Sequence, residues 1–459
     1  MEYKRKKVDQ LITDQENEEM EAYSRGYIDF LNRGKTERLA SAEMIRQAKD
    51  QGFISLEEAL KKGAQPGDKI YAENRGKGGA LILLGKDLCQ GMDIVGSHID
   101  SPRLDIKALP LTEDGGMAYF KTHYYGGLKK YNWTNIPLAL HGLVFRKDGK
   151  PVEINIGEDP SDPVFYINDL LIHLSKERLK KEADEVIKGE DLKVVVGSTS
   201  RGQEEKEENP VKKNILAFLE EKYGLDEDDF QVAEIEVVPA GPAREVGFDR
   251  SMIAAHGHDD RICSYANLRA MLDAKPKDRT KVALFVDKEE IGSVGNTGMH
   301  SSFFANLIAE LIESMKGSYS ELFLRRAFAH SRVLSADVTA SFDPVFSEVF
   351  DKENACQIGC GVALVKYSGS GGKGGSNDAN AEFLNEVRQI FDNHGVIWQT
   401  GELGGVDAGG GGTIAYILAN LGAEVVDCGT GMLSMHAPIE LAAKVDAYET
   451  YRAYRAFFD

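Results

Sequence analysis

Short apolar runs alternate with helix-like stretches in the first and last parts of the chain, and this alternation constrains the fold more than any other feature. The strand-like runs lie at residues 69–75, 80–86, 93–100, 281–287, 333–340, 360–367 and 423–429. Stretches with helical periodicity lie at 15–62, 302–315, 378–394, 413–421 and 438–457. Strands that alternate with helices in this way pack into a sheet with helices on its faces. The pattern therefore predicts an α/β domain, in which a mixed sheet is covered by helices.

The middle of the chain, at about 107–243, has a different character. It contains strand-like and hairpin-like runs, and the segment KDGK at 147–150 is typical of a turn. The stretch 162–190 is amphipathic and is predicted to be helical at its end. A chain of 459 residues is long enough for two or three domains. We therefore predict one α/β domain built from 1–106 plus 244–459, interrupted by an inserted β-rich domain at 107–243.

The composition argues against several classes of partner. A net charge of −19 and a pI near 5.1 disfavour contact with phosphate backbones and anionic lipid, so neither nucleic acid nor a membrane is expected as a partner. No apolar run approaches the roughly 20 residues of a membrane span, and the charged N-terminal segment does not resemble a secretion signal. The five cysteines suit reduced thiols better than a disulfide framework. We expect a cytoplasmic protein.

Glu289 and Glu290 stand side by side directly after the apolar run 281–287. Adjacent carboxylates at the end of a strand point in different directions, because strand side chains alternate. One of them can bind a metal while the other reaches a metal-bound water, and a two-metal hydrolase requires this division between ligand and general base. Taken alone, such a pair would be interpreted as solvated surface charge.

Further candidate ligands occur at the ends of other predicted strands. His98 and Asp100 have the spacing His-x-Asp, which places both side chains on one face of an extended segment. A carboxylate at that position can accept a hydrogen bond from the imidazole and fix its tautomer. Asp260 could bridge two metals, Asp337 lies at a strand end, and His436 lies in a loop before the last helix. Open α/β sheets form their sites at the carboxyl ends of strands, which supports this set.

The chemistry of this set indicates a two-metal centre. Imidazole and carboxylate ligands without thiolates suit zinc, with cobalt or manganese as substitutes. Two metals about 3.5–4 Å apart can hold a hydroxide between them, and a glutamate beside it can pass a proton to a leaving amine. Each residue by itself would more often be structural, and the neighbouring segment HGHD at 256–259 is expected to be structural. The prediction therefore depends on the whole set.

Two glycine-rich segments could suggest nucleotide binding, but neither has the required pattern. In GSGGKGGSN at 369–377, Lys373 is followed by Gly374, where a phosphate-binding loop requires Ser or Thr. GGGGT at 409–413 also lacks the context of a dinucleotide fingerprint. We expect the second segment to form a close-packed turn before a helix, whose N-terminus could hold a carboxylate or an oxyanion.

Five motifs in order, HIDSPRLD, DDRICS, DKEEIGS, SAD and SMHAPIE, resemble those of the M18 family of metalloaminopeptidases. This is the aspartyl aminopeptidase group within the co-catalytic zinc peptidase clan. The resemblance covers nearly the whole chain, and the ordered set is far more specific than any single motif. It implies a zinc-peptidase-like catalytic domain with an inserted dimerisation domain.

The resemblance also implies a ligand set for two Zn²⁺ ions per subunit. His98 and Asp337 would hold one metal, and Glu290 with His436 would hold the other. Asp260 would bridge the two ions, because it fits the family's spacing to the following serine. Asp259 is the alternative bridging residue.

Other roles follow from the same resemblance. Glu289 would be the general base, and Asp100 would orient His98. His173 matches a histidine that reaches a neighbouring subunit's site, where it would stabilise the tetrahedral intermediate, bind substrate or touch the metal site. Lys366 matches a lysine near the substrate, which would pair with an acidic N-terminal side chain. The glycine-rich run after Lys366 departs from the family pattern, which puts that acidic preference in question.

The function implied is that of a di-zinc aminopeptidase that removes N-terminal residues from peptides, with a metal-bridging hydroxide as nucleophile and acidic N-terminal residues as the candidate preference. Family members assemble as homododecamers built from dimers, with their sites facing an enclosed chamber. Two alternatives stay open. One is a di-metal deacylase of small N-acyl amino acids, which would act on a blocked amine. The other is a non-catalytic oligomeric cargo or scaffold protein, which would hold no metal.

Overall fold

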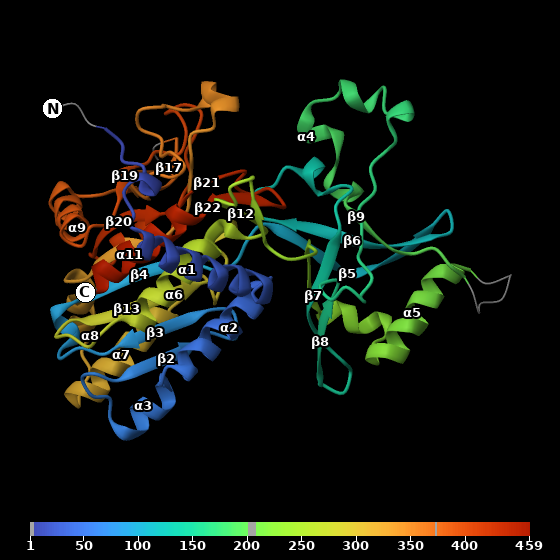
Figure 1. Cartoon of the computed structure of the whole chain (residues 1–459). Coiled ribbons are helices and arrows are strands. Elements are labelled where there is room, and N and C mark those ends of the chain that lie inside the picture. The colour runs from blue at the N-terminus through green and yellow to red at the C-terminus, as the bar shows by residue number, and fades with distance from the viewer. Residues whose placement is uncertain (1–3, 201–207, 372–373) are drawn as a thin grey trace. The chain divides into compact units, whose positions relative to one another are not determined.

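The chain forms two compact units, which are seen in the computed structural model of Figure 1. The structure describes residues 4–200, 208–371 and 374–459, so Lys373 lies outside the described residues. The first unit consists of Met1–Ser101, Ala243–Met435 and Glu440–Asp459. The second unit consists of Pro102–Pro242 and His436–Ile439. In the part of the chain that the structure describes, no helix has the length and apolar character needed to cross a membrane.

A nine-stranded mixed sheet forms the centre of the first unit. In spatial order its strands are β1 (Ile54–Ser55), β2 (Lys69–Glu73), β3 (Gly79–Leu83), β13 (Thr280–Val286), β4 (Met92–His98), β14 (Arg332–Ser335), β20 (Glu424–Gly429), β16 (Val362–Val365) and β19 (Trp398–Thr400). The four central strands β13, β4, β14 and β20 are parallel to one another. β3 and β16 pair antiparallel with the outer two of these four. The predicted mixed α/β sheet is confirmed.

Helices cover both faces of this sheet. Alternate residues of its strands therefore belong to two different hydrophobic cores. On β4 and β13, Val95 and Phe285 belong to one core, whereas Ile94 and Leu284 belong to the other. The first core includes residues of α1 (Asp14–Arg33), α2 (Glu37–Asp50), α6 (His258–Asp273), α9 (Ala381–Asn393) and α11 (Lys444–Phe458). The second includes residues of α3 (Leu56–Lys62), α7 (Phe303–Lys316), α8 (Glu321–Ala329) and α10 (Ala415–Ala419).

Two smaller strand groups complete the first unit. A five-stranded sheet has the order β11 (Arg244–Val246), β12 (Met252–Ala255), β22 (Glu440–Ala443), β21 (Gly431–Leu433) and β15 (Thr339–Ala340). A hairpin pairs β17 (Tyr367–Ser370) with β18 (Gly374–Asp378). The prediction of a helix over 438–457 is wrong at its start, because β22 precedes α11. The four residues of β22 pair with β12 and β21, and this tertiary pairing overrides the helical periodicity.

Two helices of the first unit were not predicted, namely α6 and the short α8. Along α6, only Arg269 and Asp273 are not buried. A helix that is buried on all sides has no polar face, so its sequence shows no amphipathic period. This matters for the site, because α6 carries two of its carboxylates.

The second unit contains a six-stranded antiparallel sheet. Its strands, in spatial order, are β8 (Pro151–Ile156), β7 (Leu138–Phe145), β10 (Glu234–Pro239), β5 (Arg103–Asp114), β6 (Met117–Tyr125) and β9 (Lys193–Gly197). The turn predicted at 147–150 is confirmed, since it joins β7 to β8. The helix predicted at the end of 162–190 is wrong apart from the single turn α4 (Ala183–Val186). A longer helix, α5 (Pro210–Tyr223), was not predicted.

Candidate metal centre

Three neighbouring parallel strands bring most of the candidate residues to one edge of the nine-stranded sheet. β4 ends at His98, β13 is followed by Glu289 and Glu290, and β14 is followed by Asp337. The carboxyl ends of parallel strands lie at the same edge, where open α/β sheets form their sites. The start of α6 adds Asp260, as well as its neighbour Asp259.

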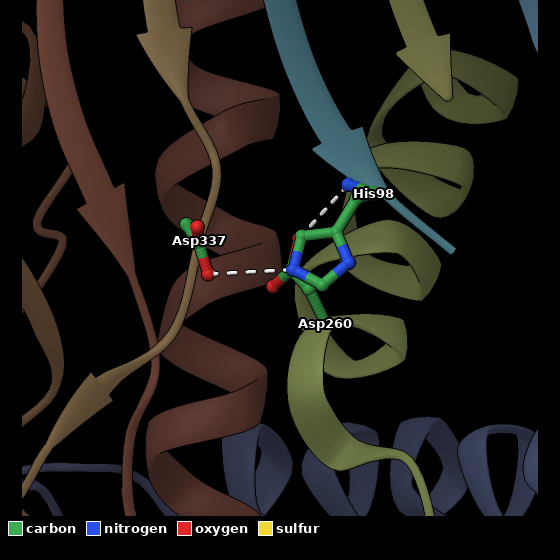
Figure 2. Close-up of side chains that lie close together, drawn as sticks. All are labelled: His98, Asp260 and Asp337. Carbon is green, nitrogen blue, oxygen red and sulfur yellow. Dashed lines mark hydrogen bonds and ion pairs between the residues drawn. The ribbon is translucent and has the colours of Figure 1, made fainter. Parts of the chain in front are cut away.

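His98 lies at the centre of this group. Its Nε2 is 3.2 Å from Oδ1 of Asp259 and 3.7 Å from Oδ1 of Asp337. Its backbone N–H donates to Oδ2 of Asp260 at 3.2 Å. Figure 2 shows His98 on the end of β4, with Asp260 and Asp337 approaching it from two other segments. The His98 side chain is 2% exposed and Asp260 is fully buried, so these groups meet away from bulk water.

Asp100 connects His98 to the segment that carries the glutamate pair. Its backbone carbonyl oxygen is 3.0 Å from Nδ1 of His98, and its Oδ1 is 3.4 Å from the same nitrogen. The two oxygens of its carboxylate also accept the backbone N–H groups of Glu289 and Glu290, each at 3.2 Å. Asp100 is fully buried. Asp100 therefore contacts both the imidazole and the backbone of the glutamate pair.

The glutamate pair lies on a tight turn that follows β13. Lys288 and Gly292 flank the pair with φ values of 67° and 93°, which places both in the left-handed region. The Lys288 ammonium lies 2.6 Å from the carboxylate of Asp287, and the Thr297 hydroxyl donates to the same carboxylate at 2.6 Å. These contacts hold the residues next to the glutamate pair, and together with the carboxylate of Asp100 they restrict where Glu289 can point.

The electrostatics of the site show an excess of buried negative charge. Burial, together with neighbouring carboxylates, raises the pKa of Glu289 to about 8, although His98 opposes this. Burial also raises the pKa of Asp337 to about 6 and that of Asp260 well above its ordinary range. Burial alone would lower the pKa of His98, but hydrogen bonds to surrounding carboxylates outweigh it and raise that pKa. A bound cation would relieve this repulsion.

The residues present fit a metal ion. Two groups of candidate ligand atoms each lie within 4.8 Å of one another, and they are His98–Asp260–Asp337 and His98–Asp259–Glu290. Oδ1 of Asp260 is buried and accepts no hydrogen bond from any residue that the structure describes. A buried polar atom without a partner requires an explanation, and a metal ion that binds there is one. Imidazole with carboxylates is a donor set that suits zinc.

Comparison with known proteins identifies the family of this chain. A family model described as "Aminopeptidase I zinc metalloprotease (M18)" matches residues 30–458. The chain belongs to the M18 aminopeptidase family. The resemblance found in the sequence motifs is thus confirmed, and this M18 protein is a zinc metalloaminopeptidase, a hydrolase of peptide bonds.

The relatives cover the M18 chain almost completely. "Probable M18 family aminopeptidase 1" of Clostridium acetobutylicum is 49% identical over 449 residues, which are 97% of this chain and 96% of the relative. The crystal structure of an M18 aminopeptidase from Thermotoga maritima is 46% identical, with a TM-score of 0.95 and 100% of both chains covered. The S. cerevisiae mApe1 dodecamer, at 21% identity, has a TM-score of 0.74 with 95% of each chain covered, so it shares the fold.

Two histidines assigned by resemblance belong to the second unit of the M18 chain. His436 lies in the segment His436–Ile439, and its Nδ1 is 2.7 Å from the carbonyl oxygen of Gly127. It is a member of neither ligand group found among the described residues. His173 lies in a 3-10 turn, Ile172–Leu174, and is exposed. Their assigned roles at the metal centre stay predictions.

Lys366 lies in the first unit, between β16 and β17. Its ammonium is 2.6 Å from the hydroxyl of Tyr367 and 3.5 Å from the carboxylate of Asp378. The side chain is 42% exposed. The cation therefore pairs with these two neighbours at the surface, and it does not have the buried position that recognition of an acidic side chain would favour.

The segment HGHD at 256–259 contains one residue with a structural role, His258, and one residue of the site, Asp259. His258 has Nδ1 2.7 Å from the hydroxyl of Tyr27 and Nε2 3.0 Å from the carbonyl oxygen of Ile253. Burial lowers its pKa to about 4, so it stays neutral. The expected structural role is confirmed for His258. Asp259, which the family resemblance left as the alternative bridging residue, has its Oδ1 3.2 Å from Nε2 of His98, closer than Oδ1 of Asp337 at 3.7 Å.

Proposed function

We propose that this M18 protein is a di-zinc aminopeptidase, which hydrolyses the N-terminal peptide bond of peptides. The observation that carries the proposal is the position of His98, which is shared by two groups of candidate ligands. Because the two groups draw on different carboxylates around one imidazole, the site has enough carboxylate ligands to support a second ion beside the first. The Glu289–Glu290 pair provides a further metal ligand and a general base. The carboxylate of Glu290 joins a ligand group, and that of Glu289 is available as the base.

The proposed ligands follow the family motifs. His98 and Asp337 would hold one zinc, Glu290 and His436 would hold the other, and Asp260 would be a ligand of both. The grouping of Asp260 and Asp337 with His98 supports the first ion, and the grouping of Glu290 with His98 supports a second ion beside it. Cobalt or manganese could substitute, because oxygen and imidazole ligands suit these ions as well.

Glu289 is the proposed general base. When bound, zinc would polarise the peptide carbonyl and lower the pKa of a water molecule at the site. Glu289 takes a proton from the attacking water at its carboxylate oxygen and delivers that proton to the leaving amine nitrogen. The carboxylate of Asp100 keeps Glu289 in place by accepting the backbone N–H of Glu289. The backbone carbonyl of Asp100 keeps His98 in one tautomer. Glu289 is half-buried, which limits the access of bulk water to this transfer.

The second unit is the proposed dimer-forming part of a homododecamer. His173 is flanked by large apolar side chains that are strongly exposed, namely Leu171 at 54%, Ile172 at 66% and Leu174 at 66%. Exposed apolar residues that cluster in one segment are typical of a surface that another subunit covers. We propose that His173 acts in the site of a neighbouring subunit, where it contacts substrate or metal. The solved dodecamer that shares this fold supports the assembly.

The variant Glu289→Gln tests the proposed chemistry. The amide cannot accept a proton but keeps the size of the side chain, so kcat on aminoacyl anilides should fall by about 10²–10⁴-fold. Zinc content, measured by elemental analysis, should stay at the wild-type level, because Glu289 is not a proposed ligand. Glu313→Gln, at an exposed position on α7, is the matched control and should keep wild-type activity. Turnover near wild type in Glu289→Gln would remove this residue from the mechanism.

The two alternative functions can be distinguished from an aminopeptidase by the substrate that is cleaved and by the zinc content of the purified protein. A deacylase of N-acyl amino acids would cleave a substrate whose amine is blocked, whereas an aminopeptidase requires the free amine. A non-catalytic scaffold would be purified without stoichiometric zinc and would turn over neither substrate. The acidic preference stays a prediction that only the sequence match of Lys366 supports.

A further inference from the structure

His98, which both groups of candidate ligands share, is held by α6 at both polar groups of its backbone. Its N–H donates to Oδ2 of Asp260 at 3.2 Å, and its carbonyl oxygen accepts the hydroxyl of Ser264 at 2.7 Å. Ser264 is fully buried and follows Asp260 by four residues. The position of the His98 imidazole therefore depends on α6 as well as on the pairing of β4 with its neighbours in the sheet.

Asn267 extends the contact of α6 to a second strand. It follows Ser264 by three residues, so the two side chains project from the same face of the helix. Its Nδ2 donates to the carbonyl oxygen of Val95 on β4 at 2.9 Å and lies 3.4 Å from the carbonyl oxygen of Leu284 on β13. β13 leads into the turn that carries the glutamate pair. One face of α6 thus contacts the backbones of both strands that lead to candidate ligands.

The hydroxyl of Ser97 lies between these contacts. Its oxygen is 2.9 Å from the hydroxyl oxygen of Ser264 and 3.3 Å from Nδ2 of Asn267. It is also 3.4 Å from the carbonyl oxygen of Leu284. Ser97, Ser264 and Asn267 are all 0% exposed, and neighbouring residues of α6 belong to the first hydrophobic core. The three side chains form one buried polar network, called below the α6 network.

The α6 network is costly to bury. Oδ1 of Asn267 is buried and accepts no hydrogen bond from any residue in the described part of the chain. An unsatisfied buried acceptor destabilises a fold, whereas a leucine of similar size would pack into the surrounding core without that cost. Local violations of this kind are expected at functional sites. The geometry that the network imposes therefore explains it better than a gain in stability does.

We propose that Ser264 and Asn267 are positioning residues of the metal centre, which act by fixing the carboxyl ends of β4 and β13 against α6. The inference rests on the di-zinc function proposed above. The proposed ligands His98, Asp260 and Glu290 belong to β4, to α6 and to the segment after β13, and the network contacts all three elements. A small displacement of one element changes the distances on which zinc affinity and proton transfer depend.

Ser264→Ala removes the donor to His98, and Ser331→Ala is its matched control. Ser331 is 1% exposed, and its hydroxyl oxygen accepts the backbone N–H of Met92, the first residue of β4, at 3.0 Å. Each variant loses a buried hydroxyl that binds the backbone of β4, one at each end of the strand, so both should lower the melting temperature by a similar few degrees. We expect zinc affinity, measured by competition with a chelator, to fall about tenfold in Ser264→Ala and to stay within about twofold of wild type in Ser331→Ala.

Asn267→Leu separates geometry from stability, because it removes the unsatisfied acceptor together with the donor. We expect the melting temperature to stay within about 3 °C of the wild type, while kcat on leucyl p-nitroanilide falls about tenfold and KM stays within about twofold. The absorption bands of bound Co²⁺ report the geometry of its ligands. They should shift in Ser264→Ala and in Asn267→Leu, but not in Ser331→Ala.

Equal zinc affinity in Ser264→Ala and Ser331→Ala, whether both are normal or both are reduced, would overturn the proposal for Ser264. Unchanged kcat together with unchanged cobalt bands in Asn267→Leu would overturn it for Asn267. Zinc affinity and the cobalt bands do not require turnover, so they decide the proposal even if the wild type hydrolyses no anilide and the proposed function fails. A wild-type protein that binds no zinc would overturn both.

Discussion

At the scale of single residues, Asp100 is the junction of the site. It is fully buried, it contacts His98 through its backbone and its carboxylate, and it accepts two N–H groups from the glutamate turn. The sequence predicted the contact with His98 from the spacing His-x-Asp. It could not predict the contacts with Glu289 and Glu290, because these depend on the pairing of β4 with β13, which lie about 190 positions apart in the chain.

Asp100→Asn tests this junction. The amide keeps one acceptor oxygen and no charge, so one of the two N–H groups loses its acceptor and the imidazole loses the neighbouring negative charge. Residues that orient a metal ligand typically change metal affinity or activity by about 10–100-fold when replaced, and we expect a loss of this size in zinc affinity by competition with a chelator. Asp9→Asn, at an exposed position, is the control. Unchanged zinc affinity together with unchanged kcat would show that Asp100 has no positioning role.

The buried side chain of Lys281, which is not part of the site, should make the stability of the protein depend on pH. It is 1% exposed, and burial, with a contribution from Lys277, lowers its pKa to about 8. The unfolded chain keeps an ordinary pKa of 10.5, so between pH 8 and 10.5 it binds more protons than the folded chain. The stability contributed by Lys281 is therefore present at high pH and is lost as the pH falls through about 8.

The variant Lys281→Met lacks this titration. We expect the melting temperature of the wild type, relative to Lys281→Met, to rise by about 1–2 °C between pH 7.5 and 9.5, as measured by calorimetry. Lys86→Met, at an exposed position, should show no such change. A constant difference between wild type and Lys281→Met across this range would contradict the lowered pKa.

At the scale of elements, the site depends on strand ends that lie very close together. Gly429 ends β20, and a Cβ at this position would lie 1.9 Å from the backbone oxygen of Asp337 and 3.0 Å from Sγ of Cys263. Glycine is required here because the backbone of β20 approaches the segment that carries a proposed ligand. Packing of one strand end thus decides the position of a carboxylate on the next.

Gly429→Ala should displace Asp337. We expect the melting temperature to fall by several degrees and zinc content to fall below one ion per chain, because the backbone oxygen cannot stay where it is. Gly374→Ala is the matched control, since a Cβ there meets no atom within 4 Å and its φ is not in the left-handed region. Equal zinc content and equal melting temperature in the two variants would show that the approach at Gly429 is not restrictive.

The elements also show where sequence patterns predict structure and where they do not. The strands that end at His98, Val286 and Ser335 were predicted, because buried parallel strands appear as short apolar runs. α6 was not predicted, because its burial on every side removes the periodic signal on which a helix prediction depends. The end of 162–190 was predicted as a helix, yet Leu174 and Leu179 stay exposed, whereas Val186 and Ile187 pack on the core of the second unit outside any longer helix.

At the scale of the whole molecule, the first unit supplies most of the proposed zinc ligands and the second unit carries two assigned histidines. His436 and His173 were proposed from family motifs, and neither could be placed at the centre by spacing alone. The other proposed ligands differ from these two histidines, because the fold of the first unit brings their side chains together. They are His98, Asp260, Glu290 and Asp337. What the sequence did not predict is the α6 network, since its contacts join segments separated by up to 172 positions.

Removal and return of the metal test most directly whether the chain is a zinc-dependent aminopeptidase. The protein is treated with a chelator, and hydrolysis of leucyl p-nitroanilide and its N-acetylated form is measured before and after zinc is added in steps. We expect activity on the free amine to be lost with the metal and to return fully as zinc approaches two ions per chain, whereas the blocked substrate is not cleaved. Activity that survives complete removal of zinc, or equal cleavage of the blocked substrate, would contradict this assignment.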